Sequence, residues 1–137
     1  MKVKIYSHSR LSTFEQCRLK FKYRYIDKIT PEIEMTIEAH LGKCVHDTLE
    51  ALYNTMLENK SNNQDTIPSL DQLITYYSNR WQENFSPSIV IVNQTLTARD
   101  YFDKGIQFII DYYTKHYPFD DNTLECEKKI IIDNVLI

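Results

Sequence analysis

A glycine, a histidine and a glutamate recur at intervals of four residues in one segment of this chain. They are Gly42, His46 and Glu50, within the sequence GKCVHDTLE. Residues four apart in an α-helix project from one side, a turn from each other. A glycine inside a helix costs up to about 1 kcal/mol relative to alanine. Close approach of backbone, metal or substrate to Gly42 would offset that cost, and His46 and Glu50 would then face the approaching group.

The same spacing also has a structural explanation. Gly42 would then permit tight helix packing, and His46 would be a satisfied histidine at the edge of an apolar stripe. Spacing alone favours this structural role. His40, Cys44 and His46 also suggest zinc, but a structural zinc site needs four ligands, usually in two close pairs. No second pair lies near them in the sequence.

Composition excludes several function classes. With only two glycines, the chain has no Walker loop, dinucleotide fingerprint or nucleophile elbow. A net charge of −3 argues against coating nucleic acid through bulk charge. Half of the 16 basic residues nevertheless fall between Lys2 and Lys28. This cluster is either a solvated helix face or a surface near the DNA backbone, and the candidates for DNA contact are Arg10, Arg18, Lys20, Lys22 and Arg24.

Apolar periodicity and capping residues predict about four helices followed by one strand. The first helical block starts at a capping box, Ser12 to Glu15, and ends before Pro31. Further helices are expected over about 36–59, 69–85 and 97–116, with 88–93 as a connector. Residues 124–133 are expected to form a strand. A lone strand has no partner for its backbone hydrogen bonds, so we expect further residues or a second chain to supply one, and dimerisation through this edge follows.

The chain carries no sign of export or of a membrane partner. No apolar run reaches the length of a membrane-spanning helix, and the N-terminus has no signal-peptide core. The three cysteines show no disulfide spacing. The expected compartment is the reducing cytoplasm.

The opening segment resembles that of RecB-like nucleases of the PD-(D/E)XK superfamily, including the AddB-type and CRISPR-associated branches. Arg18 replaces the usual proline of their motif. Gly42, His46 and Glu50 fit the Gly-x-x-x-His helix of the family with its following acidic residue, and 127–132 fits the strand before the catalytic core. The matching residues of the opening segment are Ser7, Ser9, Leu11, Phe14, Cys17, Phe21 and Tyr25.

This resemblance implies an α/β, restriction-endonuclease-like fold, of which residues 1–137 would be the mostly helical N-terminal portion. It also implies a metal-dependent nuclease, expected to be an exonuclease, that hydrolyses DNA phosphodiesters. His46 would help bind Mg²⁺ or Mn²⁺, with Gly42 and Glu50 in support. The main ligands, an Asp and a Glu-x-Lys pair, would lie past Ile137, so we expect this fragment alone to be inactive. Cys17 aligns with the first cysteine of an iron–sulfur cluster found in some relatives.

The function expected on this basis is DNA processing in repair, recombination or defence, alongside a helicase or another subunit. The alternative is a non-catalytic helical module that binds protein or nucleic acid, with His46 structural. The sequence does not indicate whether the DNA is single- or double-stranded, nor the polarity of cleavage.

Overall fold

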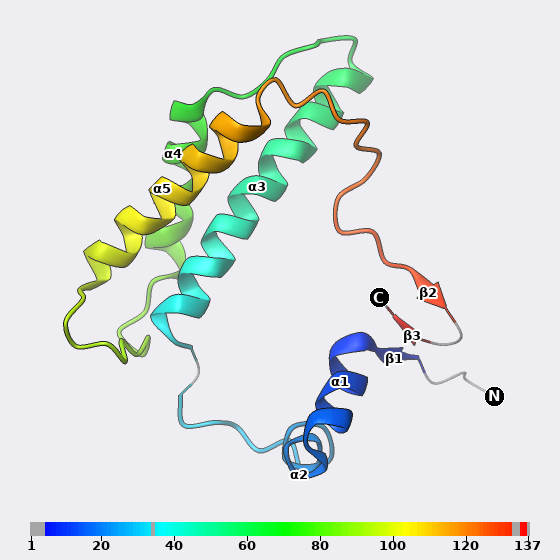
Figure 1. Cartoon of the computed structure of the whole chain (residues 1–137), viewed down its shortest axis with the longest axis vertical. Helices are drawn as coiled ribbons and strands as arrows, with labels where there is room; N and C mark the ends of the chain where they lie inside the picture. The colour runs from blue at the N-terminus through cyan, green and yellow to red at the C-terminus, as the bar shows by residue number, and fades with distance from the viewer. Residues whose placement is uncertain (1–4, 34, 133–134, 137) are drawn as a thin grey trace. The chain divides into compact units, whose positions relative to one another are not determined.

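A computed structural model describes residues 5–33, 35–132 and 135–136, which fall into two units. One unit combines the two ends of the chain, up to residue 32 and from residue 127 onward. The other is the continuous segment 33–126. Figure 1 shows three long helices in the continuous unit, and short helices and strands in the unit made from the ends.

The continuous unit is a bundle of three helices. They are α3 (Ile37–Ser61), α4 (Leu70–Asn84) and α5 (Ala98–His116), and each packs against the other two (Figure 1). All three were predicted from apolar periodicity, and their bounds agree with the expected ones to within two residues. The connector expected at 88–93 is also confirmed, since its only regular contact among the described residues is a single bridge from Val90 to Thr36.

Each helix of the bundle begins at a side chain that accepts a backbone hydrogen bond. The hydroxyl of Thr36 accepts from the N–H of Ala39 at the start of α3. Ser69 starts α4 with a capping box, and Thr97 does the same for α5. These contacts satisfy N–H groups that have no partner within the helix. The caps therefore fix where each helix starts.

The core of the bundle is aromatic and aliphatic, and it depends on one glycine. A Cβ added at Gly105 of α5 would lie 2.6 Å from Leu41 Cδ1 and 2.6 Å from Tyr77 Cζ. Only a residue without a side chain lets α5 come this close to α3 and α4. The buried hydrophobic residues are Ile37, Leu41, Cys44, Leu52, Met56, Leu73, Tyr77, Trp81, Tyr101, Ile109 and Phe119.

The first helical block differs in detail from the prediction. It consists of α1 (His8–Gln16), α2 (Arg18–Phe21) and a π-helical turn η1 (Lys22–Ile26). The capping box expected at Ser12 is wrong, because Ser7 caps α1 by accepting from the N–H of Arg10 at 3.2 Å. Ser12 lies inside α1. Cys17 has extended backbone, with φ −159° and ψ 107°, and separates α1 from α2.

Three two-residue strands join the ends of the chain. They are β1 (Tyr6–Ser7), β2 (Ile131–Ile132) and β3 (Val135–Leu136), in the order β1-β3-β2. β3 pairs parallel to β1 and antiparallel to β2. The strand expected over 124–133 is therefore wrong for residues 124–130, and Asp133 lies outside the described residues. Glu127 has a positive φ of 51°, which an extended strand does not accommodate.

The expectation of a strand without a partner is also wrong. β2 bonds to β3, and β3 bonds to β1 near the other end of the chain. Periodicity reports local conformation and not pairing across more than a hundred residues, so this sheet was not visible in the sequence. The argument for dimerisation through an unpaired strand loses its basis.

Candidate functional site

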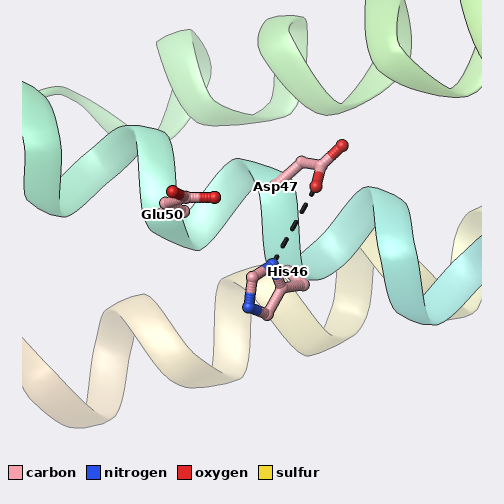
Figure 2. A group of neighbouring side chains, drawn as sticks. All are labelled: His46, Asp47 and Glu50. Carbon is pink, nitrogen blue, oxygen red and sulfur yellow. Dashed lines mark ion pairs between the residues drawn. The ribbon is translucent and has the colours of Figure 1, made fainter. Parts of the chain in front are cut away.

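Three potential ligand side chains leave α3 close together. Their ligand atoms, from His46, Asp47 and Glu50, all lie within 4.8 Å of one another. Figure 2 shows His46 and Asp47 at neighbouring positions and Glu50 a turn further along the helix. His46 Nδ1 lies 3.9 Å from Asp47 Oδ1. The side chain of His46 is 56% exposed, so it lies outside the core, and this exposure is compatible both with a metal ligand and with a structural histidine at the edge of the apolar stripe.

Asp47 is the member of this group that sequence reasoning missed. It directly follows His46, and on a helix adjacent residues do not share a face. Its carboxylate nevertheless approaches the ring of His46, and its Oδ2 accepts a hydrogen bond from Arg80 Nη2 of α4 at 2.8 Å. This hydrogen bond is the main reason that the pKa of the Arg80 guanidinium is raised above its ordinary value.

The chemistry of these side chains suits a divalent cation. Carboxylate oxygens are the ligands that Mg²⁺ and Mn²⁺ prefer, and an imidazole nitrogen binds many divalent metals. Asp47 and Glu50 also line a polar hollow of about 380 Å³ between α3 and α4. Glu58 and Arg80 line the same hollow, so three acidic groups and one basic group meet there. The group therefore fits a Mg²⁺- or Mn²⁺-type cation by its donor types and spacing.

Comparison with protein families identifies the chain. The model of the PD-(D/E)XK nuclease superfamily matches residues 5–125, which includes His46, Asp47 and Glu50. The chain belongs to the PD-(D/E)XK nuclease superfamily. Comparison with curated proteins and with solved structures gives no significant match.

Membership in this superfamily makes the chain part of a group of metal-dependent nucleases that act on DNA. The mostly helical architecture with short strands at its ends agrees with the expected PD-(D/E)XK fragment. Within the described ranges, no helix combines the length and apolar character needed to span a membrane. The match does not extend to a RecB-like or AddB-type assignment, which stays a proposal.

The structure does not show the tight helix packing that was one explanation for Gly42. A Cβ built on Gly42 meets no atom within 4 Å among the described residues. Neither tight helix packing nor close approach of backbone therefore accounts for Gly42 within this part of the superfamily fold. The close approach that a glycine permits occurs instead at Gly105, which the sequence analysis did not single out.

His40 and Cys44 belong to the core and not to the site of this nuclease-family chain. Both side chains are fully buried, and Cys44 Sγ lies 3.8 Å from His40 Nε2. The ring of His40 packs edge-on against Trp81 and Phe85. Burial lowers the pKa of His40 and raises the pKa of the Cys44 thiol. These two residues fill space in the bundle, whereas His46 is exposed.

The basic residues proposed for DNA contact are unequally placed. Arg10 lies over the rings of Tyr6, Phe21 and Tyr25, and its Nε is buried without a hydrogen-bond partner among the described residues. Lys22 forms an ion pair of 2.9 Å with Asp27. The remaining candidates, all exposed, are Arg18, Lys20 and Arg24.

The cysteines of this chain do not by themselves fit an iron–sulfur cluster. A cluster is held by four thiolates as a rule, and the chain has three cysteines. Cys44 is buried in the core, and Cys17 is exposed. Cys17 Sγ accepts a hydrogen bond from the N–H of Lys20 at 3.4 Å. A role for Cys17 as a cluster ligand stays a prediction.

Proposed function

We propose that residues 1–137 form part of a RecB-like DNA nuclease in which His46 binds Mg²⁺ or Mn²⁺. The observation that carries this proposal is an exposed histidine beside two carboxylates, on a chain that belongs to the PD-(D/E)XK superfamily. A bound divalent cation in such an enzyme stabilises negative charge on the phosphodiester and activates water. His46 contributes a ring nitrogen, and Asp47 and Glu50 contribute negative charge.

We further propose that an Asp and a Glu-x-Lys pair outside residues 1–137 complete the centre. Mg²⁺ requires near-octahedral coordination, and the group on α3 offers three ligand atoms. Residues 1–137 alone should then bind the cation without cleaving DNA. No described residue lies within 4 Å of a Cβ at Gly42, one turn before His46, so this position would accommodate the rest of the centre or substrate.

The setting that we propose is DNA repair, recombination or defence in the cytoplasm, with a helicase or another subunit as a partner. The resemblance of the opening segment to RecB-like nucleases supports this setting, and three cysteines without disulfide spacing are typical of a reducing compartment. The expected mode of cleavage is exonucleolytic. Arg18, Lys20 and Arg24 are exposed and would lie near the DNA backbone.

A Mn²⁺ titration of residues 1–137, with free Mn²⁺ measured by electron paramagnetic resonance, tests the metal site. His46→Ala should weaken Mn²⁺ binding by at least about tenfold. Loss of a group that only supports a metal ligand already lowers affinity about 10- to 100-fold, and His46 is proposed as a ligand itself. His116→Ala is the matched control, because His116 is also an exposed histidine on a helix but lies outside the group. It should bind Mn²⁺ like the parent.

DNA cleavage by the longer protein that would carry this segment tests the activity. The parent should cleave single- or double-stranded DNA with Mn²⁺, and a folded His46→Ala variant should not. Equal Mn²⁺ binding by the parent and His46→Ala, with no cleavage by either, would instead favour the helical binding module with a structural His46.

A further inference from the structure

Arg80 of α4 reaches α3 and holds one side of Asp47. Its Nη2 donates to Asp47 Oδ2 at 2.8 Å, and its Nη1 donates to Glu83 Oε2 at 3.3 Å. The other oxygen of Asp47, Oδ1, lies 3.9 Å from His46 Nδ1. Asp47 therefore has one oxygen bound to α4 and the other directed toward His46.

The carboxylates of Asp47 and Glu50 repel each other, and the contact with Arg80 offsets part of this repulsion. Their ligand oxygens lie within 4.8 Å, and both groups carry negative charge when ionised. Arg80 places a positive charge directly against Asp47. The side chains of Asp47 and Arg80 are only 19% and 32% exposed, so water screens this pair less than a pair on the open surface.

Arg80 is itself fixed by its surroundings. Glu83, one turn further along α4, binds its second terminal nitrogen. The Nε of Arg80 is buried against the bundle and has no hydrogen-bond partner among the described residues. A guanidinium held at two points orients a carboxylate better than a mobile surface lysine, because less side-chain freedom is lost when the hydrogen bond forms.

We propose that Arg80 is a positioning residue of the metal site, which keeps Asp47 Oδ1 directed at His46. The inference rests on the proposed function, since it requires that His46 binds a divalent cation. Groups that hydrogen-bond a ligating side chain orient it, and their loss typically lowers metal affinity about 10- to 100-fold. If Arg80 acted only as a nearby positive charge, its removal would strengthen cation binding. The two roles predict changes of opposite sign.

Arg80→Met removes the charge and the donors while it keeps a side chain of similar length. Mn²⁺ affinity of residues 1–137, measured by electron paramagnetic resonance, should fall about 10- to 100-fold. Glu83→Gln is the matched control, because it weakens the other ion pair of Arg80 and leaves the contact with Asp47 in place. Its affinity should fall much less than that of Arg80→Met, because the hydrogen bond from Arg80 to Asp47 remains. Urea unfolding of each variant establishes that the protein is folded under the conditions of the titration.

A double-mutant cycle shows whether Arg80 acts through Asp47. In an Asp47→Asn background, Arg80→Met should cause no further loss of Mn²⁺ affinity. If Arg80→Met does not fold, Arg80→Lys replaces it in the same cycle. The Mn²⁺ affinity of Arg80→Lys should also fall, although the lysine keeps the positive charge. Unchanged or raised affinity in the Arg80 variant, or an equal loss in both backgrounds, overturns the inference.

The outcomes also separate this inference from the proposed function. A loss of Mn²⁺ binding in His46→Ala without a loss in the Arg80 variant overturns only the role of Arg80. Equal Mn²⁺ binding by the parent and His46→Ala overturns the metal site itself, and with it the role of Arg80.

Discussion

Two histidines of α3 lie six residues apart in opposite surroundings. His40 is fully buried between aromatic rings, whereas His46 projects into solvent beside carboxylates. A neutral ring suits the interior, because burial penalises the charged form. The exposed ring of His46 lies next to acidic groups, an arrangement that suits a cation. One helix thus uses the same residue type once for packing and once at the candidate site.

His40 should make the stability of the bundle depend on pH. Burial lowers its pKa in the folded protein, and nearby Lys43 acts in the same direction. Below the ordinary histidine pKa of about 6.5, the unfolded chain binds a proton that the folded chain resists. The stability that a neutral His40 gives the folded protein is therefore fully present above the ordinary pKa. It is lost as the pH falls toward the lowered pKa of His40 in the folded protein. Between pH 7 and 5 the free energy of unfolding should fall by at most about 1.4 kcal/mol per pH unit from this group.

Urea unfolding at pH 7 and pH 5 measures this effect. His40→Phe should lose less stability than the parent between the two pH values. An identical loss in His40→Phe and the parent would show that other groups cause it.

At the residue scale, the sequence predicts which site residues lie close together only when they belong to the same helix. His46 and Glu50 share a side of α3 because they are four apart, and that relation follows from helix geometry. Asp47 joins them through a contact to Arg80, 33 positions away. No local pattern in the chain indicates that pairing, because it depends on how α4 packs against α3.

At the scale of elements, close contact between helices depends on Gly105 and not on Gly42. Gly105→Ala would drive a methyl group into the side chain of Leu41 in α3 and into the ring of the fully buried Tyr77 in α4. We expect it to lower the free energy of unfolding by about 1–3 kcal/mol. Gly42→Ala meets no described atom and should raise it by up to about 1 kcal/mol through helix propensity.

The two alanine variants are controls for each other, because both place the same methyl group inside an α-helix. Urea denaturation at neutral pH compares them with the parent. If Gly105→Ala raised the free energy of unfolding, the close packing of α5 on α3 and α4 would not contribute to stability. If Gly42→Ala lowered it strongly, another segment would have to cover α3 at that position.

Helix bounds were predictable because their signals are local. Thr36, Ser69 and Thr97 cap the three long helices, and apolar spacing marks the faces that pack. The strand over 124–133 was predicted from β-branched residues, but the left-handed backbone of Glu127 interrupts it. Strand pairing depends on distant partners, so local signals do not determine it.

At the scale of the whole molecule, charge is unevenly distributed along the chain. Residues 5–32 contain six lysines and arginines against three acidic residues, although the chain as a whole has a net charge of −3. The remaining residues are correspondingly acidic. The segment of α1, α2 and η1 is therefore the part of the chain whose charge favours an anionic ligand such as a phosphate backbone.

This distribution leads to a prediction about DNA binding. Lys20→Ala and Arg24→Ala should each weaken binding at all sequences and reduce the slope of log affinity against log salt by about one. Lys22→Ala is the comparison, because Lys22 is already paired with Asp27 and should contribute less to the slope. Fluorescence anisotropy with labelled DNA at several salt concentrations measures these slopes. Unchanged slopes in the first two variants would exclude this segment as the phosphate-binding surface.

The parallel pairing of β1 with β3 also bears on the order in which the protein folds. Tyr6 and Val135 are partners in this ladder, so a loop that includes the entire segment 33–126 closes when it forms. Closing so long a loop costs entropy before any contact compensates for it. During synthesis the continuous segment 33–126 is able to fold as it leaves the ribosome, while β1 waits for a partner that is made after this segment. The unit that carries the basic surface is consequently completed after the bundle that carries His46.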